Sequence, residues 1–299
     1  MKDQITKLKK EKNAVILAHY YVDGTVQEIA DYVGDSYYLA EVATKVQEST
    51  IIFCGVSFMG ESAKILNPGK RVVMADQYAD CPMAHMAAID KIHEVRAQYK
   101  DVAVVCYVNS TAEIKTASDV CVTSSNAVNI VKNLPNHDIY FIPDENLAHH
   151  VAGKVPEKHF IFNDGFCHVH KSIEASEVKK AKEAYTNALV LVHPECTKDV
   201  LELADYIGST SQIIEYATKS DAKEFIIGTE MGIFYELLLK NPDKKFYPVN
   251  PKQICPNMKR ISIESVLNAL KTLLPEVVLD EEVRIKAYEP LKRMLDLAK

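Results

Sequence analysis

Three short cysteine segments carry the strongest chemical signal in the sequence. They contain Cys81, Cys167 and Cys255, which are separated by 86 and 88 residues. Each follows a short apolar run that we predict to be a buried strand, at 71–75, 159–162 and 246–249. Near-equal spacing in equivalent settings indicates one unit used three times. Three thiolates that meet at a pseudo-threefold axis would make a site for a metal ion or an iron–sulfur cluster.

Two kinds of metal site suit three cysteines. Tetrahedral zinc takes three thiolates and a fourth ligand, and His170, at C-x-x-H spacing from Cys167, is a candidate for that position. A [4Fe–4S] cluster takes three thiolates and leaves one iron open to substrate. An open iron is a Lewis acid that assists the loss of water. The residues by themselves leave both alternatives open.

The segments that must position these cysteines also repeat. Three apolar, β-branched runs end in polar residues, as buried parallel strands do at a functional edge: AVILAHYY at 14–21, VAVVCYVN at 102–109 and ALVLVHPE at 188–195. At offsets of 88 and 86, the runs align His19 with Tyr107 and His193. Tyr21, Asn109 and Glu195 follow at the same offsets.

Further positions repeat along each unit. Ser36, Ser124 and Thr210 align, each before a helical pattern, at 38–46, 126–134 and 212–218. A small hydroxyl residue there is a helix N-cap signal, and free N–H groups at a helix start favour anions. A third strand, a helix, a fourth strand and the cysteine segment follow. Each unit therefore reads as a helix and then β-α-β-α-β-α-β, with a small parallel sheet covered on both faces.

The predicted fold class is α/β, with three homologous three-layer αβα domains arranged with pseudo-threefold symmetry around a central site. We expect domains at 1–84, 85–170 and 171–258, with the helices of 259–299 packing back on the first domain. Ligands of parallel α/β sheets bind beyond the carboxyl ends of the strands. The polar strand ends and the cysteine segments should therefore share one cavity, which suits a ligand with several carboxylates or a phosphate.

Composition restricts the partners. The chain has 299 residues, 47% of them hydrophobic and 25% charged, as an ordinary globular protein does. A net charge of −6 argues against a non-specific nucleic-acid binder. Apolar runs are too short for a membrane span, and the first 13 residues are too charged for a signal peptide, so we expect a cytoplasmic protein. Seven cysteines, an odd number, fit a reducing compartment. The sequence lacks the G-x-x-x-x-G-K-[ST], G-x-G-x-x-G, G-x-S-x-G and H-E-x-x-H motifs.

With these residues assembled, the chain resembles the quinolinate synthase family, the A proteins of bacterial and archaeal NAD biosynthesis. The resemblance covers nearly all of the chain and depends on several segments taken together: LAHYY, GDS, CPM, YVNSTAE, TSSNA, CHVH, HPEC, GSTSQ and CPNM. It implies three related α/β domains around a [4Fe–4S] cluster on Cys81, Cys167 and Cys255. It also implies a transferase-class condensation of iminoaspartate with dihydroxyacetone phosphate, which gives quinolinate, phosphate and water. Transient contact with the L-aspartate oxidase or aspartate dehydrogenase that supplies iminoaspartate is a further expectation.

The resemblance also carries over an active-site set. Its catalytic members are Glu195, Tyr21, Tyr107, His193 and His19, and its substrate-binding members are His19, Ser36, Asn109, Ser124, His170, Ser209 and Thr210. We assign proton transfer to Glu195 and Tyr21, a task that needs pKa values near neutrality. Tyr107 and His193 would polarise the substrate carbonyl or protonate the leaving phosphate. His170 is placed as a substrate contact, because a fourth protein ligand would close the catalytic iron. Met258 stands where some family members have a further cysteine, so a redox disulfide is not expected here.

Three functions therefore compete. The leading hypothesis is an iron–sulfur condensing enzyme. The second is a zinc enzyme that uses the same cysteines with His170 as the fourth ligand. The third is a non-catalytic three-domain module that binds a dicarboxylate and holds a structural metal ion.

Overall fold

The structure, a computed structural model, describes residues 1–298 and contains three parallel four-stranded sheets. The first has the order β2-β1-β3-β4 and comprises β1 (Ala14–His19), β2 (Tyr32–Gly34), β3 (Thr50–Cys54) and β4 (Arg71–Met74). The second has the order β6-β5-β7-β8 and comprises β5 (Val102–Tyr107), β6 (Val120–Val122), β7 (Asp138–Ile142) and β8 (His159–Phe162). The third has the order β10-β9-β11-β12 and comprises β9 (Leu189–Val192), β10 (Tyr206–Ile207), β11 (Glu224–Gly228) and β12 (Lys245–Pro248). The predicted α/β class with three small parallel sheets is confirmed.

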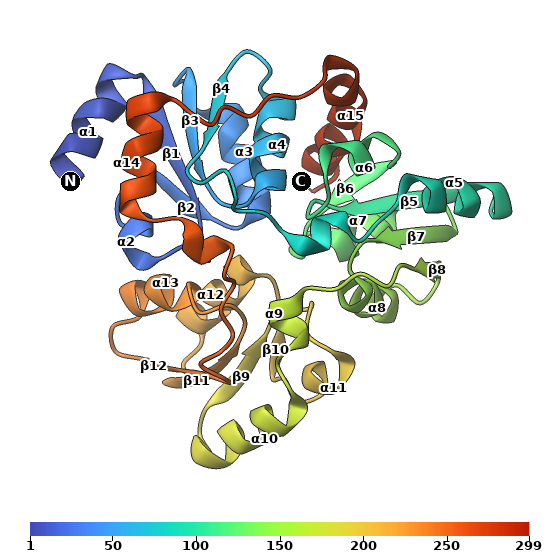
Figure 1. Ribbon diagram of the computed structural model, residues 1–299. Coiled ribbons are helices and arrows are strands. Elements are labelled where there is room, and N and C mark those ends of the chain that lie inside the picture. The colour runs from blue at the N-terminus through green and yellow to red at the C-terminus, as the bar shows by residue number, and fades with distance from the viewer. Residues whose placement is uncertain (299) are drawn as a thin grey trace.

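Helices cover the faces of the sheets, as the alternating sequence pattern predicts. Those around the first sheet are α1 (Lys2–Glu11), α2 (Gly24–Gln27), α3 (Ser36–Lys45) and α4 (Ser57–Leu66). Those of the second are α5 (Ile89–Gln98), α6 (Ala112–Thr116), α7 (Ala127–Asn133) and α8 (Glu145–Lys154). Those of the third are α10 (Ala175–Ala184), α11 (Lys198–Leu201), α12 (Thr210–Lys219) and α13 (Ile233–Lys240). Figure 1 shows the three sheets as lobes around a common centre.

Short helical turns follow all three cysteines, Cys81, Cys167 and Cys255. They are η1 (Pro82–His85), α9 (His168–Lys171) and η2 (Met258–Arg260). All residues of the central strands β1 and β5 are buried, which accounts for their continuous apolar, β-branched sequence. Cys54, Cys106, Cys121 and Cys196 are buried as well. Within residues 1–298, none of the helices combines the length and the apolar character that a membrane span requires.

An aspartate repeats the same contact in all three sheets. Oδ2 of Asp31, Asp119 and Asp205 accepts a hydrogen bond from the backbone N–H of the central strand, at 2.8, 2.7 and 2.8 Å. The donors are Ile16, Val104 and Val190, whose carbonyls in turn accept the N–H of the same aspartates at 2.9 Å. These positions are related by the offsets of 88 and 86 found in the sequence. The repeated geometry agrees with the sequence alignment of the three units.

The C-terminal helices join two of the units. α14 (Ile263–Thr272) contacts α1, α2 and β3 of the first unit. The segment after it pairs with the edge of the first sheet, where Val277 N–H donates to the Val72 carbonyl at 2.8 Å. α15 (Glu281–Leu297) then packs against α4 and also against α6 and β6 of the second unit. The last helix therefore goes beyond the expected return to the first unit and bridges the first and second sheets (Figure 1).

Candidate active site

The carboxyl ends of the three sheets share one cavity. Thirteen of the fourteen predicted site residues line it: His19, Tyr21, Ser36, Cys81, Tyr107, Asn109, Ser124, Cys167, His170, His193, Glu195, Thr210 and Cys255. Ser209 is fully buried behind the lining, where its hydroxyl caps α12. The parallel topology explains the convergence, because it places the ends of all central strands at the same edge.

The three thiols of the cysteine segments enter this cavity as free cysteines. Burial raises the pKa of each thiol. The pKa of Cys81 is raised to about 12, because the neighbouring Cys255 and Glu195 add to the effect of burial. The thiols are therefore protonated near neutral pH, and binding of a metal ion or cluster would displace their protons. Three soft sulfur ligands in one enclosed place suit zinc or an iron–sulfur cluster.

His19 and His193 hold the same imidazole orientation in the first and third units. Nδ1 of His19 accepts the backbone N–H of Tyr21 at 3.1 Å, and Nδ1 of His193 accepts that of Glu195 at 3.4 Å. Burial lowers both histidine pKa values to about 3, so both rings are neutral at pH 7. With Nδ1 accepting, the ring proton resides on Nε2. Each histidine is therefore a neutral hydrogen-bond donor at the cavity wall.

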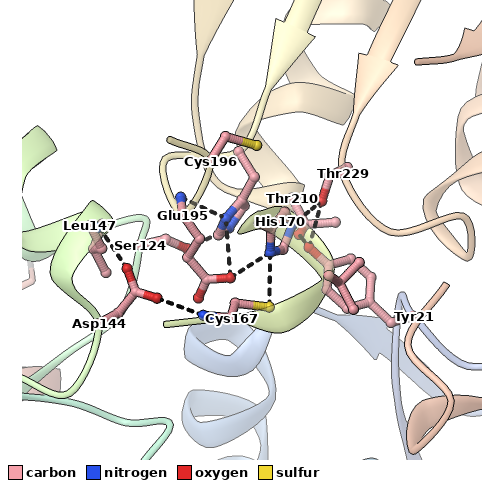
Figure 2. A network of polar contacts seen from close by, with 12 residues as sticks. Tyr21, Ser124, Asp144, Leu147, Cys167, His170, Glu195, Cys196, Thr210 and Thr229 are labelled. Atoms are coloured by element: carbon pink, nitrogen blue, oxygen red, sulfur yellow. Dashed lines mark hydrogen bonds and ion pairs between the residues drawn. The ribbon is translucent and has the colours of Figure 1, made fainter. Parts of the chain in front are cut away.

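Glu195 lies at the centre of the polar network shown in Figure 2. Its Oε2 is 2.6 Å from Nδ1 of His170 and 3.6 Å from Nδ1 of His193. The rings of the two histidines stack with centroids 4.5 Å apart. Burial acts to raise the pKa of Glu195, but hydrogen bonds from His170 and Tyr107 act against it, and the pKa lies below its ordinary value. The carboxylate is therefore ionised, although it is 3% exposed.

Tyr21 approaches the same network from the first unit. Its hydroxyl lies 2.9 Å from Oγ1 of Thr210 and 2.8 Å from Oγ1 of Thr229, and Thr229 in turn lies 2.9 Å from Nε2 of His170 (Figure 2). Burial, with Glu195 nearby, raises the pKa of Tyr21 and of Tyr107 well above the ordinary value. Both phenols are therefore neutral and able to donate a proton or a hydrogen bond.

The prediction that Ser36, Ser124 and Thr210 cap three helices was wrong in detail. The N-caps of α3, α7 and α12 are Asp35, Asn126 and Ser209. A capping side chain must precede the first helical residue, and Ser36 and Thr210 are themselves the first residues of their helices. Their hydroxyls consequently remain at the cavity wall. Ser124 lies in the turn before α7, 3.2 Å from Nε2 of His193.

Sequence reasoning missed several residues of the site. Asp35, Phe58, Thr123 and Glu230 also line the cavity, and Thr229 links Tyr21 to His170. Glu230 and Asp144 follow the third strands of their sheets, so the 86-residue offset between them was the available signal. Burial raises the pKa of both carboxyls, whereas the hydrogen bonds that they accept from backbone N–H groups act to lower it.

One group of side chains has the spacing of a metal site. Single ligand atoms of Cys167, His170 and Glu195 all lie within 4.8 Å of one another. The His170 Nδ1 atom is 3.2 Å from the Cys167 sulfur and 2.6 Å from Oε2 of Glu195. In addition, the buried Oε1 of Glu195 and Oδ1 of Asn109 have no hydrogen-bond partner among residues 1–298. Unpaired buried acceptors at the wall of a cavity indicate that a ligand completes the site.

Three parallel α/β units that enclose thiols, neutral histidines and a buried carboxylate define an α/β enzyme with a thiol-lined central site. The chain belongs to the quinolinate synthetase A protein family, whose model matches residues 3–296. A relative named quinolinate synthase from Fusobacterium nucleatum subsp. nucleatum is 55% identical, with 100% of this chain and 99% of the relative covered. Proteins of the same name from Caldicellulosiruptor saccharolyticus and Clostridioides difficile are 52% and 50% identical over nearly their full lengths. The resemblance noted in the sequence is thereby confirmed.

Proposed function

We propose that this chain is a quinolinate synthase of NAD biosynthesis, which condenses iminoaspartate with dihydroxyacetone phosphate and releases phosphate and water. The observation that carries the proposal is the convergence of three free thiols, two neutral histidines and one ionised carboxylate in a single cavity. Both substrates are anionic, and the cavity wall offers hydroxyl and imidazole donors for them. The names of full-length relatives support the same activity.

We assign Cys81, Cys167 and Cys255 as ligands of a [4Fe–4S] cluster. Three soft thiols in one cavity, beside the unpaired oxygens of Glu195 and Asn109, fit such a group. When bound, the cluster would supply an open iron that acts as a Lewis acid in the loss of water. We keep His170 as a substrate contact at the cavity wall and not as a fourth ligand. Both of its ring nitrogens have protein partners, Nδ1 with Glu195 and Cys167 and Nε2 with Thr229, so neither is free for the cluster.

The remaining side chains divide into proton carriers and binding groups. Glu195 accepts a proton at its unpaired Oε1, and an anionic substrate beside it would raise its pKa toward the range of a working base. Tyr21 and Tyr107, both neutral phenols, donate protons or hydrogen bonds. His19 and His193 donate from Nε2 to substrate carboxylate or carbonyl oxygens. Ser36, Asn109, Ser124 and Thr210 bind carboxylate and phosphate groups, and Ser209 holds the start of α12 behind them.

The test of this function uses protein purified without oxygen. We expect about four iron and four sulfide ions per chain, and formation of quinolinate from the two substrates. Cys167→Ala should lose both the cluster and the activity. Wild-type activity in that variant, or a colourless parent protein without iron, would contradict the assignment.

A second candidate function is a zinc enzyme centred on Cys167, His170 and Glu195, a ligand set that differs from the three cysteines and His170 of the zinc hypothesis drawn from the sequence. It is favoured by the short distances among the ligand atoms of these three residues. Cys81→Ala separates the two candidates, because Cys81 belongs only to the cluster set. A zinc enzyme should keep its metal content and its turnover in this variant, whereas a cluster enzyme should lose both.

A further inference from the structure

The same main-chain hydrogen bond docks all three cysteine segments. Ser57, Glu145 and Met231 are equivalent positions that follow the third strand of each sheet by a few residues. Their backbone N–H groups donate to the carbonyl two residues before the cysteine, on Ala79, Gly165 and Gln253, at 2.9, 2.8 and 3.0 Å. The backbone frame around the three cysteines is therefore repeated.

The side chain just before each of these donors differs between the units. The equivalent residues are Val56, Asp144 and Glu230. Asp144 Oδ2 accepts the backbone N–H of Cys167 at 3.1 Å, while its Oδ1 accepts that of Leu147 at 2.7 Å (Figure 2). Glu230 Oε1 accepts the backbone N–H of Cys255 at 3.0 Å. Both acidic residues are completely buried.

In the first unit an apolar residue, Val56, replaces the buried acid, and the carboxylate that holds the cysteine belongs to the adjacent Asp80, whose Oδ1 also accepts a hydrogen bond from Ser57 Oγ. Cys81 N–H donates to Oδ1 of the adjacent Asp80 at 2.8 Å. The Asp80 side chain is 45% exposed and pairs with His85 at 2.7 Å. Water competes for an exposed carboxylate, so this contact holds its segment less firmly than a buried one does.

Burying a carboxylate is unfavourable unless hydrogen bonds compensate it. Asp144 and Glu230 each accept at least two hydrogen bonds, one of them from a cysteine N–H. Oε2 of Glu230 also accepts from Gly232 N–H at 2.5 Å and from Lys259 Nζ at 3.2 Å. Each acid thus ties the end of a third strand to a cysteine segment through buried hydrogen bonds. No proton transfer or substrate contact explains Asp144, which is completely buried beside Cys167 and is absent from the cavity wall.

We propose that Asp144 and Glu230 are positioning residues that hold Cys167 and Cys255 in place for the metal centre. The proposal rests on the cluster assignment for the identity of the group that is held. The positioning itself is tested on the metal-free chain, so that failure of one idea can be told from failure of the other.

The first experiment measures the reaction of each cysteine with N-ethylmaleimide in metal-free protein, by mass spectrometry. Asp144→Ala should raise labelling of Cys167 roughly tenfold, because leaving one buried N–H without its acceptor shifts an opening equilibrium by that order. Cys81 should stay within about twofold of the parent chain. Glu230→Ala should act in the same way on Cys255. Because Asp80 is exposed, Asp80→Ala should have a smaller effect on Cys81.

A second measurement follows iron release to a chelator from anaerobically prepared protein. Asp144→Ala and Glu230→Ala should release iron about tenfold faster than the parent chain, or assemble less of it. The conservative variants Asp144→Asn and Glu230→Gln keep the shape and one acceptor oxygen, so they should fold and give intermediate rates. If the parent chain holds no iron at all, the cluster assignment fails. The labelling experiment still tests whether the two acids position the cysteines, because it uses metal-free protein.

The matched control is Asp119→Ala. Asp119 also accepts a strand N–H in the second unit, at 2.7 Å, but it does not contact a cysteine segment. This variant should lower thermal stability without changing labelling at Cys167. The proposal is overturned if Cys167 labelling in Asp144→Ala stays within about twofold of the parent. It is also overturned if all three cysteines react faster in Asp144→Ala and also in Asp119→Ala, since that pattern would indicate a general loosening of the fold.

Discussion

The central strands of the first and third sheets end in the same way but lead into different chemistry. His19 and His193 occupy equivalent positions, and each accepts the N–H of the residue two places on. That residue is Tyr21 in the first unit and Glu195 in the third. Burial raises the phenol pKa of Tyr21 well above its ordinary value, whereas the carboxyl pKa of Glu195 lies below its ordinary value. One backbone pattern thus presents a neutral proton donor opposite an ionised acceptor, the separation of pKa values that acid–base catalysis requires.

The largest effect on kcat should come from substitution of Glu195, the proton acceptor. We expect Glu195→Gln to keep the metal centre and the fold but to lower kcat by about 10³-fold or more, because the amide cannot take up a proton. Turnover by the anaerobic enzyme, with iron content measured in the same sample, checks this. A variant with parental kcat would show that Glu195 is not the proton acceptor of the reaction.

Substitution of Tyr21, the proton donor, should have a smaller effect on kcat. Tyr21→Phe removes the hydroxyl that contacts Thr210 and Thr229 and should lower kcat by about 10²-fold. The double variant with Glu195→Gln should cost less than the product of the two single effects, since both groups act in one network. Full additivity of the two losses would show that the two strand ends work independently.

The two histidines should affect binding more than turnover. His19→Gln and His193→Gln should each raise KM about tenfold, the loss of one hydrogen bond to a charged oxygen. His193→Gln should also change kcat, because the His193 ring lies 3.6 Å from Glu195. The His19 imidazole has one hydrogen bond, from Tyr21 N–H, among the contacts described for residues 1–298. Equal KM and kcat changes in both variants would remove the proposed difference between the strand ends.

The same histidines make stability depend on pH. Their pKa values are about 3 in the folded chain, below the 6.5 expected when unfolded. The unfolded state therefore binds more protons below pH 6.5, and stability falls as pH decreases from about 6.5 toward 3, by up to ~1.4 kcal/mol per pH unit for each ring. Urea denaturation of metal-free protein at pH 7 and pH 5 measures this. His19→Gln should reduce the pH dependence, and an unchanged slope would contradict the burial of a neutral ring.

Much of the fold could be predicted because its signals are local and repeated. Apolar runs that end in polar residues located the central strands, and offsets of 88 and 86 aligned the units. The bridging role of α15 could not be foreseen, because its apolar stripe is compatible with packing on either neighbouring unit. The boundaries at 84/85 and 170/171 stay a prediction.

The residue types of the candidate site could be predicted better than the contacts that those residues make. The sequence alone determined which thiols, imidazoles and carboxylates lie at strand ends, because the order of residues along the chain fixes both the strand pattern and the repeat. Only the tertiary structure decided that Asp35 and Ser209 cap helices beside the cavity, that Thr229 joins Tyr21 to His170, and that buried acids hold two cysteine segments but not the third. Those contacts join residues from up to 208 positions apart, and their existence depends on how three separate sheets meet.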